Sequence, residues 1–145
     1  MTEAVFQDIE MYPPSLLDTD ILSELFKGHS LVKAKAAEYI GRHKRLTISQ
    51  IAKYEILKGL KSKKAFKQIE IFNRFCSVNI VFPITDDVIG KASDIYAELK
   101  EEGSLISDAD ILVAATAIVN NLVLVTNNTN HFSRIKKLQL DNWKI

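Results

Sequence analysis

Acidic residues from distant parts of the sequence are the side chains best suited to chemistry. Asp18 directly follows a short apolar run, and Glu55 lies within a second apolar segment. Asp108 and Asp110 stand just before a third and longer one. Carboxylates that converge at one point repel each other unless a divalent cation neutralises them. If the fold gathers these acids, we expect an oxygen-lined metal site.

The types of ligand present favour a hard cation. A site built from oxygen atoms alone suits Mg²⁺ or Mn²⁺ better than zinc. Cys76 is the only cysteine, and the three histidines, His29, His43 and His131, are scattered along the chain and are expected to be surface or packing residues. Nothing in these spacings indicates a zinc site. A magnesium or manganese site suits phosphodiester hydrolysis, in which the metal activates water and shields the phosphate.

Each acid also has an ordinary structural interpretation. Asp18 is a good helix N-cap, and Ser107 with Asp110 matches a capping box. Residues two apart on a helix do not share a face, so we expect at most one of Asp108 and Asp110 to bind a metal directly. Asp110 is the better candidate, because Ala114 one turn later leaves room beside it.

Short strands and helices alternate along the chain and must position these acids. The apolar patterns predict strands at 15–17, 46–48, 79–82 and 122–125, an edge strand at 138–140, and helices at 21–26, 30–40, 51–58, 65–75, 85–100 and 111–119. This order predicts an α/β fold, a three-layer α/β/α sandwich around a short, mainly parallel sheet. Ligand crevices in such sheets form at the carboxyl ends of the strands, where Asp18 is expected.

Two helices carry more detailed predictions. The helix that begins after Ser49 is expected to end at Gly59, because glycine weakens a helix interior. The helix over 30–40 is expected to bury a face made of Leu31, Ala34, Ala37 and Ile40. Near the end of the chain, Trp143 is expected to pack back onto the domain.

Length and composition describe an ordinary globular chain of 145 residues with 47% hydrophobic residues. Residues 1–14 are acidic, weakly patterned and closed by two prolines, so we interpret them as an N-terminal extension, with Met11 as an alternative start. Residues 15–145 are expected to form one domain. No apolar run approaches the roughly 18 residues of a membrane helix, and the first residues do not form a secretory signal. We therefore expect no membrane contact and a cytoplasmic location.

The net charge of +1 conceals two oppositely charged segments. Residues 41–80 hold ten basic residues and two acidic ones, whereas residues 84–110 hold eight acidic residues and two basic ones. A basic segment beside a carboxylate site would hold a phosphate backbone while the acids hold a metal. The alternative interpretation is an ordinary solvated helix face.

Four sequence blocks together resemble the PIN-domain ribonucleases of the VapC toxin type. The blocks follow one another in the order of that family and contain Asp18, Glu55, Asp110 and Asn128; they are residues 16–25, 51–59, 108–117 and 124–132. Each block is weak evidence alone, and four in order are strong evidence. The resemblance covers residues 15–143.

The resemblance implies a PIN fold and an endoribonuclease that depends on Mg²⁺ or Mn²⁺. Asp18, Glu55 and Asp110 correspond to the family's metal-binding and catalytic acids, with Asp108 as a further candidate. The resemblance also implies a homodimer that cleaves RNA and is inhibited by a cognate, VapB-like antitoxin covering the site. Operator DNA would be bound only through that antitoxin.

The sequence departs from the family pattern at two positions. Asn128 stands where many relatives have a fourth acid, so a second metal would bind weakly or only with substrate. Asp20 stands where asparagine is frequent and adds a negative charge. Thr126, in the same block as Asn128, is a further candidate for the site.

Two other functions are compatible with these residues. Asp18 and Asp20 after a buried strand are similar to the nucleophile and acid/base pair of haloacid-dehalogenase-like phosphatases. That family then requires a hydroxyl, a lysine and an acid pair in order, whereas here the acid pair precedes Thr126. The second alternative is a PIN-fold binding module whose catalysis has lapsed because Asn128 weakens the metal site.

Overall fold

The computed structural model describes residues 12–145. Its strands are β1 Ser15–Leu17, β2 Thr47–Ser49, β3 Ile80–Phe82, β4 Val123–Val125 and β5 Leu140–Asp141. Its helices are α2 Thr19–Lys27, α3 Ser30–His43, α4 Gln50–Ser62, α5 Phe66–Val78, α6 Asp86–Glu102, α7 Asp108–Val119 and α8 Thr129–Phe132. The predicted strands and helices are present with shifted ends. The short helix α8 lies where the sequence suggested only a polar connection.

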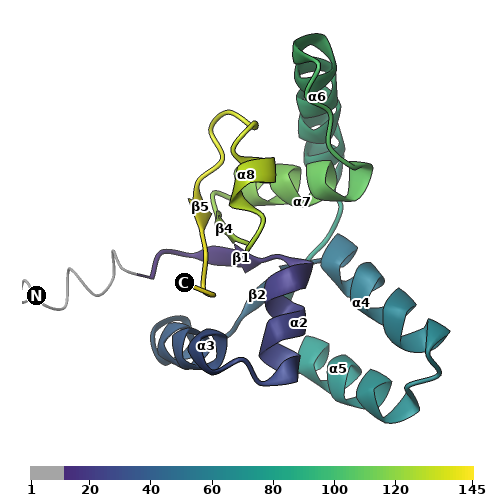
Figure 1. Ribbon diagram of the computed structural model, residues 1–145, viewed down its shortest axis with the longest axis vertical. Coiled ribbons are helices and arrows are strands. Elements are labelled where there is room, and N and C mark those ends of the chain that lie inside the picture. The colour runs from purple at the N-terminus through teal and green to yellow at the C-terminus, as the bar shows by residue number, and fades with distance from the viewer. Residues whose placement is uncertain (1–11) are drawn as a thin grey trace, which may run out of the picture.

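The strands form two hydrogen-bonded parallel groups, β1-β4-β5 and β2-β3, that lie side by side at the centre of the molecule (Figure 1). β1 pairs with β4 and β4 with β5, while β2 pairs with β3, and all three pairings are parallel. β2 lies beside β1, so the spatial order is β3-β2-β1-β4-β5. This order brings the carboxyl ends of β1 and β4, which are far apart in the sequence, to the same edge of the sheet.

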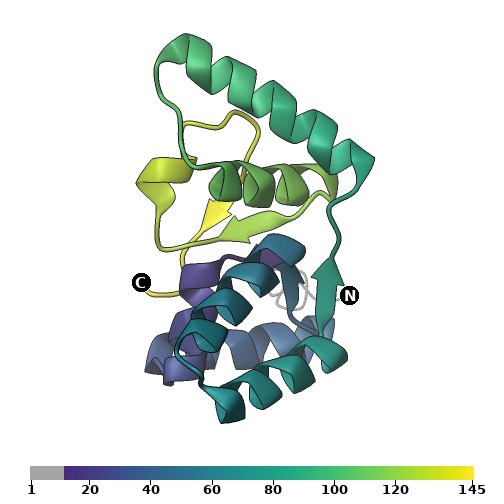
Figure 2. The ribbon, with the colours of Figure 1, turned by 90° about the vertical axis from the view of Figure 1, so that its right-hand side faces the viewer.

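Helices cover both faces of the sheet, which confirms the predicted three-layer sandwich (Figures 1 and 2). α6, α7 and α8 lie on one side, and α2 to α5 lie on the other. Because successive side chains of a strand point to opposite faces, Leu16 and Leu124 join one hydrophobic cluster while Leu17 and Val125 join the other. Both faces of β1 and β4 are therefore buried, as the short continuous apolar runs predicted.

The prediction that Gly59 ends its helix is wrong. α4 continues to Ser62, and the space where a side chain would stand at Gly59 is open. A glycine inside a helix costs only about 1 kcal/mol relative to alanine. Ile56 and Leu60 on either side pack against the hydrophobic core and keep the chain helical through the glycine.

The predicted buried face of α3 is also wrong. Val32, Ala36 and Tyr39 are buried, whereas Leu31 and Ile40 are 37% and 40% exposed. The hydroxyl oxygen of Tyr39 accepts a hydrogen bond of 3.0 Å from the backbone N–H of Ser15. This bond attaches α3 to the start of β1, while Val32, Ala36 and Tyr39 pack into one hydrophobic cluster.

The predicted packing of the C-terminal segment is confirmed. Trp143 is 1% exposed, and its ring centroid lies 5.7 Å from that of Tyr39. Most of the proposed extension at 1–14, including Met11, lies outside the described residues. None of the helices within residues 12–145 is long and apolar enough to cross a membrane.

Candidate functional site

The pairing of β1 with β4 brings Asp18 to Thr126. Leu17 and Val125 are partners in the parallel register. The next residue of each strand, Asp18 or Thr126, therefore lies at the same edge of the sheet. The Thr126 hydroxyl donates a hydrogen bond of 2.9 Å to Oδ2 of Asp18. The other oxygen of Asp18 accepts 2.8 Å from the N–H of Thr19 and caps α2. Asp18 is therefore a helix cap and also the most deeply placed acid of the candidate site.

The Asp18 carboxyl group is held in an unfavourable electrostatic environment. It is 6% exposed, and the pKa of Asp18 is raised from 3.8 to about 7, mainly by burial and next by the charge of Asp20. The hydrogen bonds from Thr19 and Thr126 lower this pKa, and the charge of Asp110 contributes to its increase. A divalent cation bound here would supply a positive partner for the ionised carboxylate.

Asp20 ties two parts of the site together. Its Oδ1 accepts a hydrogen bond of 2.7 Å from the N–H of Ile21, and its Oδ2 accepts one of 2.9 Å from the N–H of Asn127. Burial raises the pKa of Asp20, and these two backbone donors partly offset the increase. The additional charge at this position therefore fixes the loop after β4 against the start of α2.

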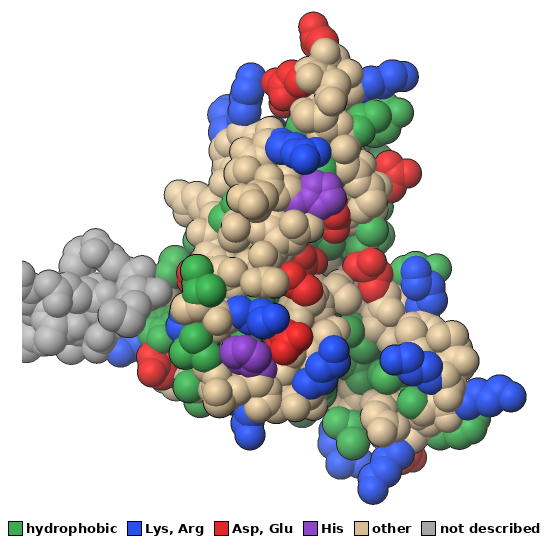
Figure 3. All heavy atoms as spheres, in the orientation of Figure 1, with side chains coloured by type: hydrophobic (Ala, Val, Ile, Leu, Met, Phe, Trp, Pro, Cys, Tyr) green, Lys and Arg blue, Asp and Glu red, His purple; other side chains and the backbone are tan. Residues whose placement is uncertain are grey.

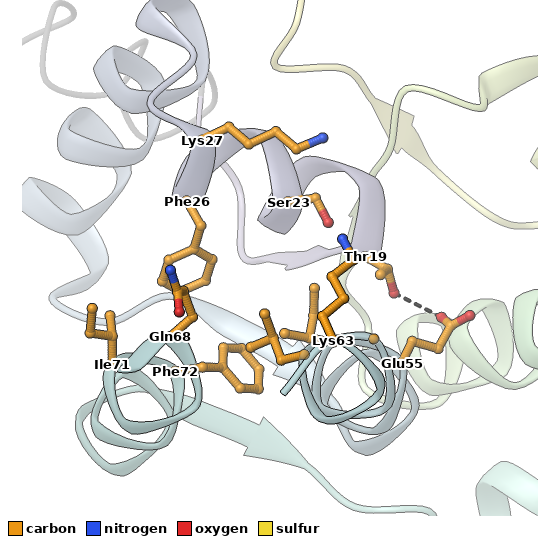
Figure 4. A pocket seen from close by; sticks show the side chains of 12 residues that line it. Thr19, Ser23, Phe26, Lys27, Glu55, Lys63, Gln68, Ile71 and Phe72 are labelled. Carbon is orange, nitrogen blue, oxygen red and sulfur yellow. Dashed lines mark hydrogen bonds between the residues drawn. The ribbon is translucent and has the colours of Figure 1, made fainter. Parts of the chain in front are cut away.

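Glu55 reaches the site from α4, which begins directly after β2 with Ser49 as its N-cap. Its Oε1 accepts a hydrogen bond of 2.8 Å from the hydroxyl of Thr19, the neighbour of Asp18 (Figure 4). Thr19 was not predicted to belong to the site. The sequence did contain a signal for it, because Thr19 is a hydroxyl residue directly after Asp18 at the end of a predicted strand.

Asp110 reaches the site from the first turn of α7. Ser107 caps this helix by accepting a hydrogen bond of 3.2 Å from the N–H of Asp110. Oδ2 of Asp110 lies 3.7 Å from Nδ1 of His131, and the same ring nitrogen lies 2.7 Å from Nδ2 of Asn128. Asp108 is exposed, whereas Asp110 is half-buried and influences the pKa of Asp18. His131, expected from the sequence to be a surface or packing residue, thus lies beside an acid of the site.

The side chains at this edge carry oxygen atoms, the type of ligand that Mg²⁺ binds. Among residues 12–145, no three acidic, histidine or cysteine side chains lie close enough to hold an ion without other ligands. Mg²⁺ rarely needs such a cage, because it usually keeps several waters and binds one or two carboxylates together with substrate phosphates. Acidic side chains gather across the middle of the molecule, between α7 and α2 (Figure 3). This edge of the sheet offers hard oxygen ligands around one buried carboxylate.

Basic side chains gather beside the acidic edge, over α4, α5 and their connection (Figure 3). Six of them are exposed: Lys58, Lys61, Lys63, Lys64, Lys67 and Arg74. The basic segment of the sequence therefore borders the acidic edge, to which α4 itself contributes Glu55, whereas most acids of residues 84–110 lie on α6. An anionic polymer can contact the basic helices while one of its phosphates approaches the acids.

Comparisons with known sequences identify the family. Residues 15–138 match the model of the PIN domain. The chain is 35% identical over 125 residues to Ribonuclease VapC1 of Methanocaldococcus jannaschii, covering 86% of this chain and 83% of that protein. It is 30% identical over 129 residues to Ribonuclease VapC2 of Rickettsia felis, and the alignment covers 88% of this chain and 96% of that protein.

Solved structures agree with the sequence matches. VapBC2 from Rickettsia felis, bound to a DNA fragment from its promoter, contains a chain that matches with a TM-score of 0.80 and 29% identity, over 90% of this chain and 99% of that one. A chain of VapBC-1 from nontypeable Haemophilus influenzae matches with a TM-score of 0.77 and 26% identity, over 92% of this chain and 100% of that one. With nearly its whole described length aligned to these proteins, this chain belongs to the PIN domain family and, within it, to the VapC type.

Proposed function

We propose that this chain is a metal-dependent endoribonuclease toxin that hydrolyses RNA phosphodiester bonds and is inhibited by a cognate antitoxin. The observation that carries the proposal is the buried Asp18 carboxyl group, whose pKa of about 7 reflects burial beside other acids. VapC relatives that align over most of the chain support the same activity. The exposed cations of α4 and α5 offer a surface for the RNA backbone.

Asp18, Glu55 and Asp110 are the residues that would hold Mg²⁺ or Mn²⁺. When bound, the ion supplies a Lewis acid for the phosphate and lowers the pKa of a coordinated water. Thr126 orients Asp18, and Thr19 orients Glu55, through the hydrogen bonds described above. The remaining candidates lie around these acids. Asp20 anchors the loop after β4, Asn128 contacts the ring of His131, and Asp108 is exposed.

The partners of the proposed enzyme follow from its relatives. The structures it resembles are VapBC assemblies, and the Rickettsia felis assembly is bound to promoter DNA. For this chain we propose a VapB-like antitoxin that covers the acidic edge, and a homodimer of the toxin. Operator DNA would be contacted through the antitoxin.

The phosphatase alternative conflicts with the surroundings of Asp20. In that chemistry the second aspartate must exchange a proton with the substrate. Here its two oxygens accept backbone N–H groups from Ile21 and Asn127. Asp20 is therefore engaged in holding the loop.

Cleavage by the purified chain is expected to require a divalent cation. A fluorescent single-stranded RNA should stay intact in EDTA and be cut after Mg²⁺ or Mn²⁺ is restored, because the acids need the ion to approach a phosphate. Denaturing gel electrophoresis measures the products, and a preparation of Asp18→Asn purified in the same way controls for contaminating nuclease. Equal cleavage in EDTA would contradict the proposal, and lack of cleavage with every cation would favour the lapsed binding module.

A further inference from the structure

A pocket of about 410 Å³ opens directly beside Glu55, between α2, α4 and α5 (Figure 4). Thr19 and Glu55 line one part of it, so the pocket is continuous with the acidic edge. Its volume lies within the range of about 300–1,000 Å³ that is usual for small-molecule sites. A group bound here would lie next to a phosphate held at the acids.

One wall of the pocket presents an aromatic ring. Phe26 lines the pocket and remains 43% exposed. Its ring centroid lies 5.7 Å from that of Phe72 and 5.1 Å from that of Phe75, both in edge-to-face geometry. These contacts hold the exposed ring in a fixed orientation. A preformed aromatic surface of this kind favours stacking with another flat ring.

The polar side chains of the pocket complement a nucleotide. Gln68 projects from α5 and offers both a donor and an acceptor, which suits the edge of a base. Lys27 from the end of α2 and Lys63 from the end of α4 bring two positive charges to the same pocket. Glu55, at the boundary with the metal site, is the only acid of the lining within the described residues. Apart from that boundary, the lining consists of apolar, neutral polar and cationic residues.

We propose that this pocket receives one unstacked base of single-stranded RNA, from a nucleotide adjacent to the scissile phosphate. The base stacks on Phe26 and hydrogen-bonds to Gln68, while Lys27 and Lys63 bind the flanking phosphates. Proteins read single-stranded RNA in this way, by aromatic stacking and contacts to base edges. The proposal rests on the proposed ribonuclease function, and it makes the pocket the determinant of which nucleotide lies beside the cut.

Cleavage of random-sequence RNA tests whether the pocket selects a base, and it does not require knowledge of the natural target. Wild-type protein and variants cleave single-stranded RNA 12-mers in Mg²⁺, and sequencing of the product ends gives the base preference at each position around the cut. Wild-type protein should prefer certain bases at one position next to the cut. Gln68→Ala should flatten the preference at that position alone. Asn73→Ala, which removes another exposed amide of α5 outside the pocket lining, should leave it unchanged.

A second variant tests the stacking surface. Phe26→Leu keeps an apolar side chain against Phe72 and Phe75 but removes the exposed ring, so cleavage at limiting RNA concentration should fall roughly tenfold. Its thermal unfolding midpoint shows whether the protein remains folded. If Phe26→Leu unfolds, Gln68→Ala decides the question alone, because Gln68 is exposed.

The outcomes separate this inference from the proposed function. RNA cleavage by wild-type protein that disappears in Asp18→Asn, with a base preference unchanged by Gln68→Ala, would overturn the base pocket and keep the ribonuclease. The same holds for cleavage without any base preference, and the pocket would then be better explained as a site for a protein partner. Absence of cleavage by wild-type protein would overturn both.

Discussion

Asp18→Asn is expected to abolish RNA cleavage and growth arrest while the protein stays folded. Asparagine retains one oxygen, which can accept the hydrogen bond from the N–H of Thr19 and keep the cap of α2. Its NH2 group then faces Thr126, whose hydroxyl oxygen can accept a hydrogen bond in place of donating one, so β1 and β4 stay joined. It lacks the negative charge that would hold the metal. Because metal stabilisation of a phosphoryl transition state contributes several kcal/mol, cleavage should fall by about a thousandfold or more.

Initial rates on a fluorescent RNA and growth after induction measure the two effects. Asp87→Asn is a matched control, because it also removes one carboxylate from the first turn of a helix, but at an exposed position of α6. This control should retain cleavage and toxicity. Undiminished toxicity of Asp18→Asn would contradict the assignment of Asp18 to the metal site.

The stability of the metal-free protein is expected to decrease as the pH rises from about 4 to about 7. The pKa of Asp18 is about 7 in the folded chain against an ordinary value of 3.8, so the folded state binds the proton more tightly than the unfolded state. The stabilisation by this proton is fully present below pH 3.8 and is lost as the pH approaches 7. The loss from this group amounts to about 4 kcal/mol of unfolding free energy.

Urea denaturation in EDTA at several pH values measures this dependence. Asp18→Asn has no proton to lose at this position, so its stability should decrease much less over the same interval. At a pH of about 8 the variant should be more stable than the wild-type protein in EDTA. Added Mg²⁺ should stabilise the wild-type protein and not the variant, because the ion binds the folded state. Parallel pH profiles for the two proteins would contradict the raised pKa of Asp18.

The strands could be predicted from the sequence because each is a short apolar run bounded by turn or polar residues. The run 122–125 between two pairs of asparagines predicted β4 within one residue. The behaviour of Gly59 and the buried face of α3 were not predictable in this way. Both depend on tertiary contacts, namely the packing around α4 and the hydrogen bond between Tyr39 and Ser15.

Part of the candidate site could be predicted because strand ends are recognisable in the sequence. Asp18 and Thr126 each follow a buried strand, and parallel pairing of the two strands places them together. The hydrogen bond from Thr19 to Glu55 joins residues 36 positions apart on different helices, so spacing could not reveal it. The contact of His131 with Asp110 likewise depends on the position of α8, which has no apolar pattern of its own.

A crystal of the wild-type protein grown with Mn²⁺ would show directly whether the three acids share one cation, because anomalous scattering locates the ion independently of the protein atoms. We expect a manganese peak about 2.1 Å from an oxygen of Asp18, with Asp110 and Glu55 bound to the ion directly or through water. An anomalous map with no peak at Asp18 at saturating Mn²⁺, and with the three carboxylates facing separate regions of solvent, would contradict the metal site.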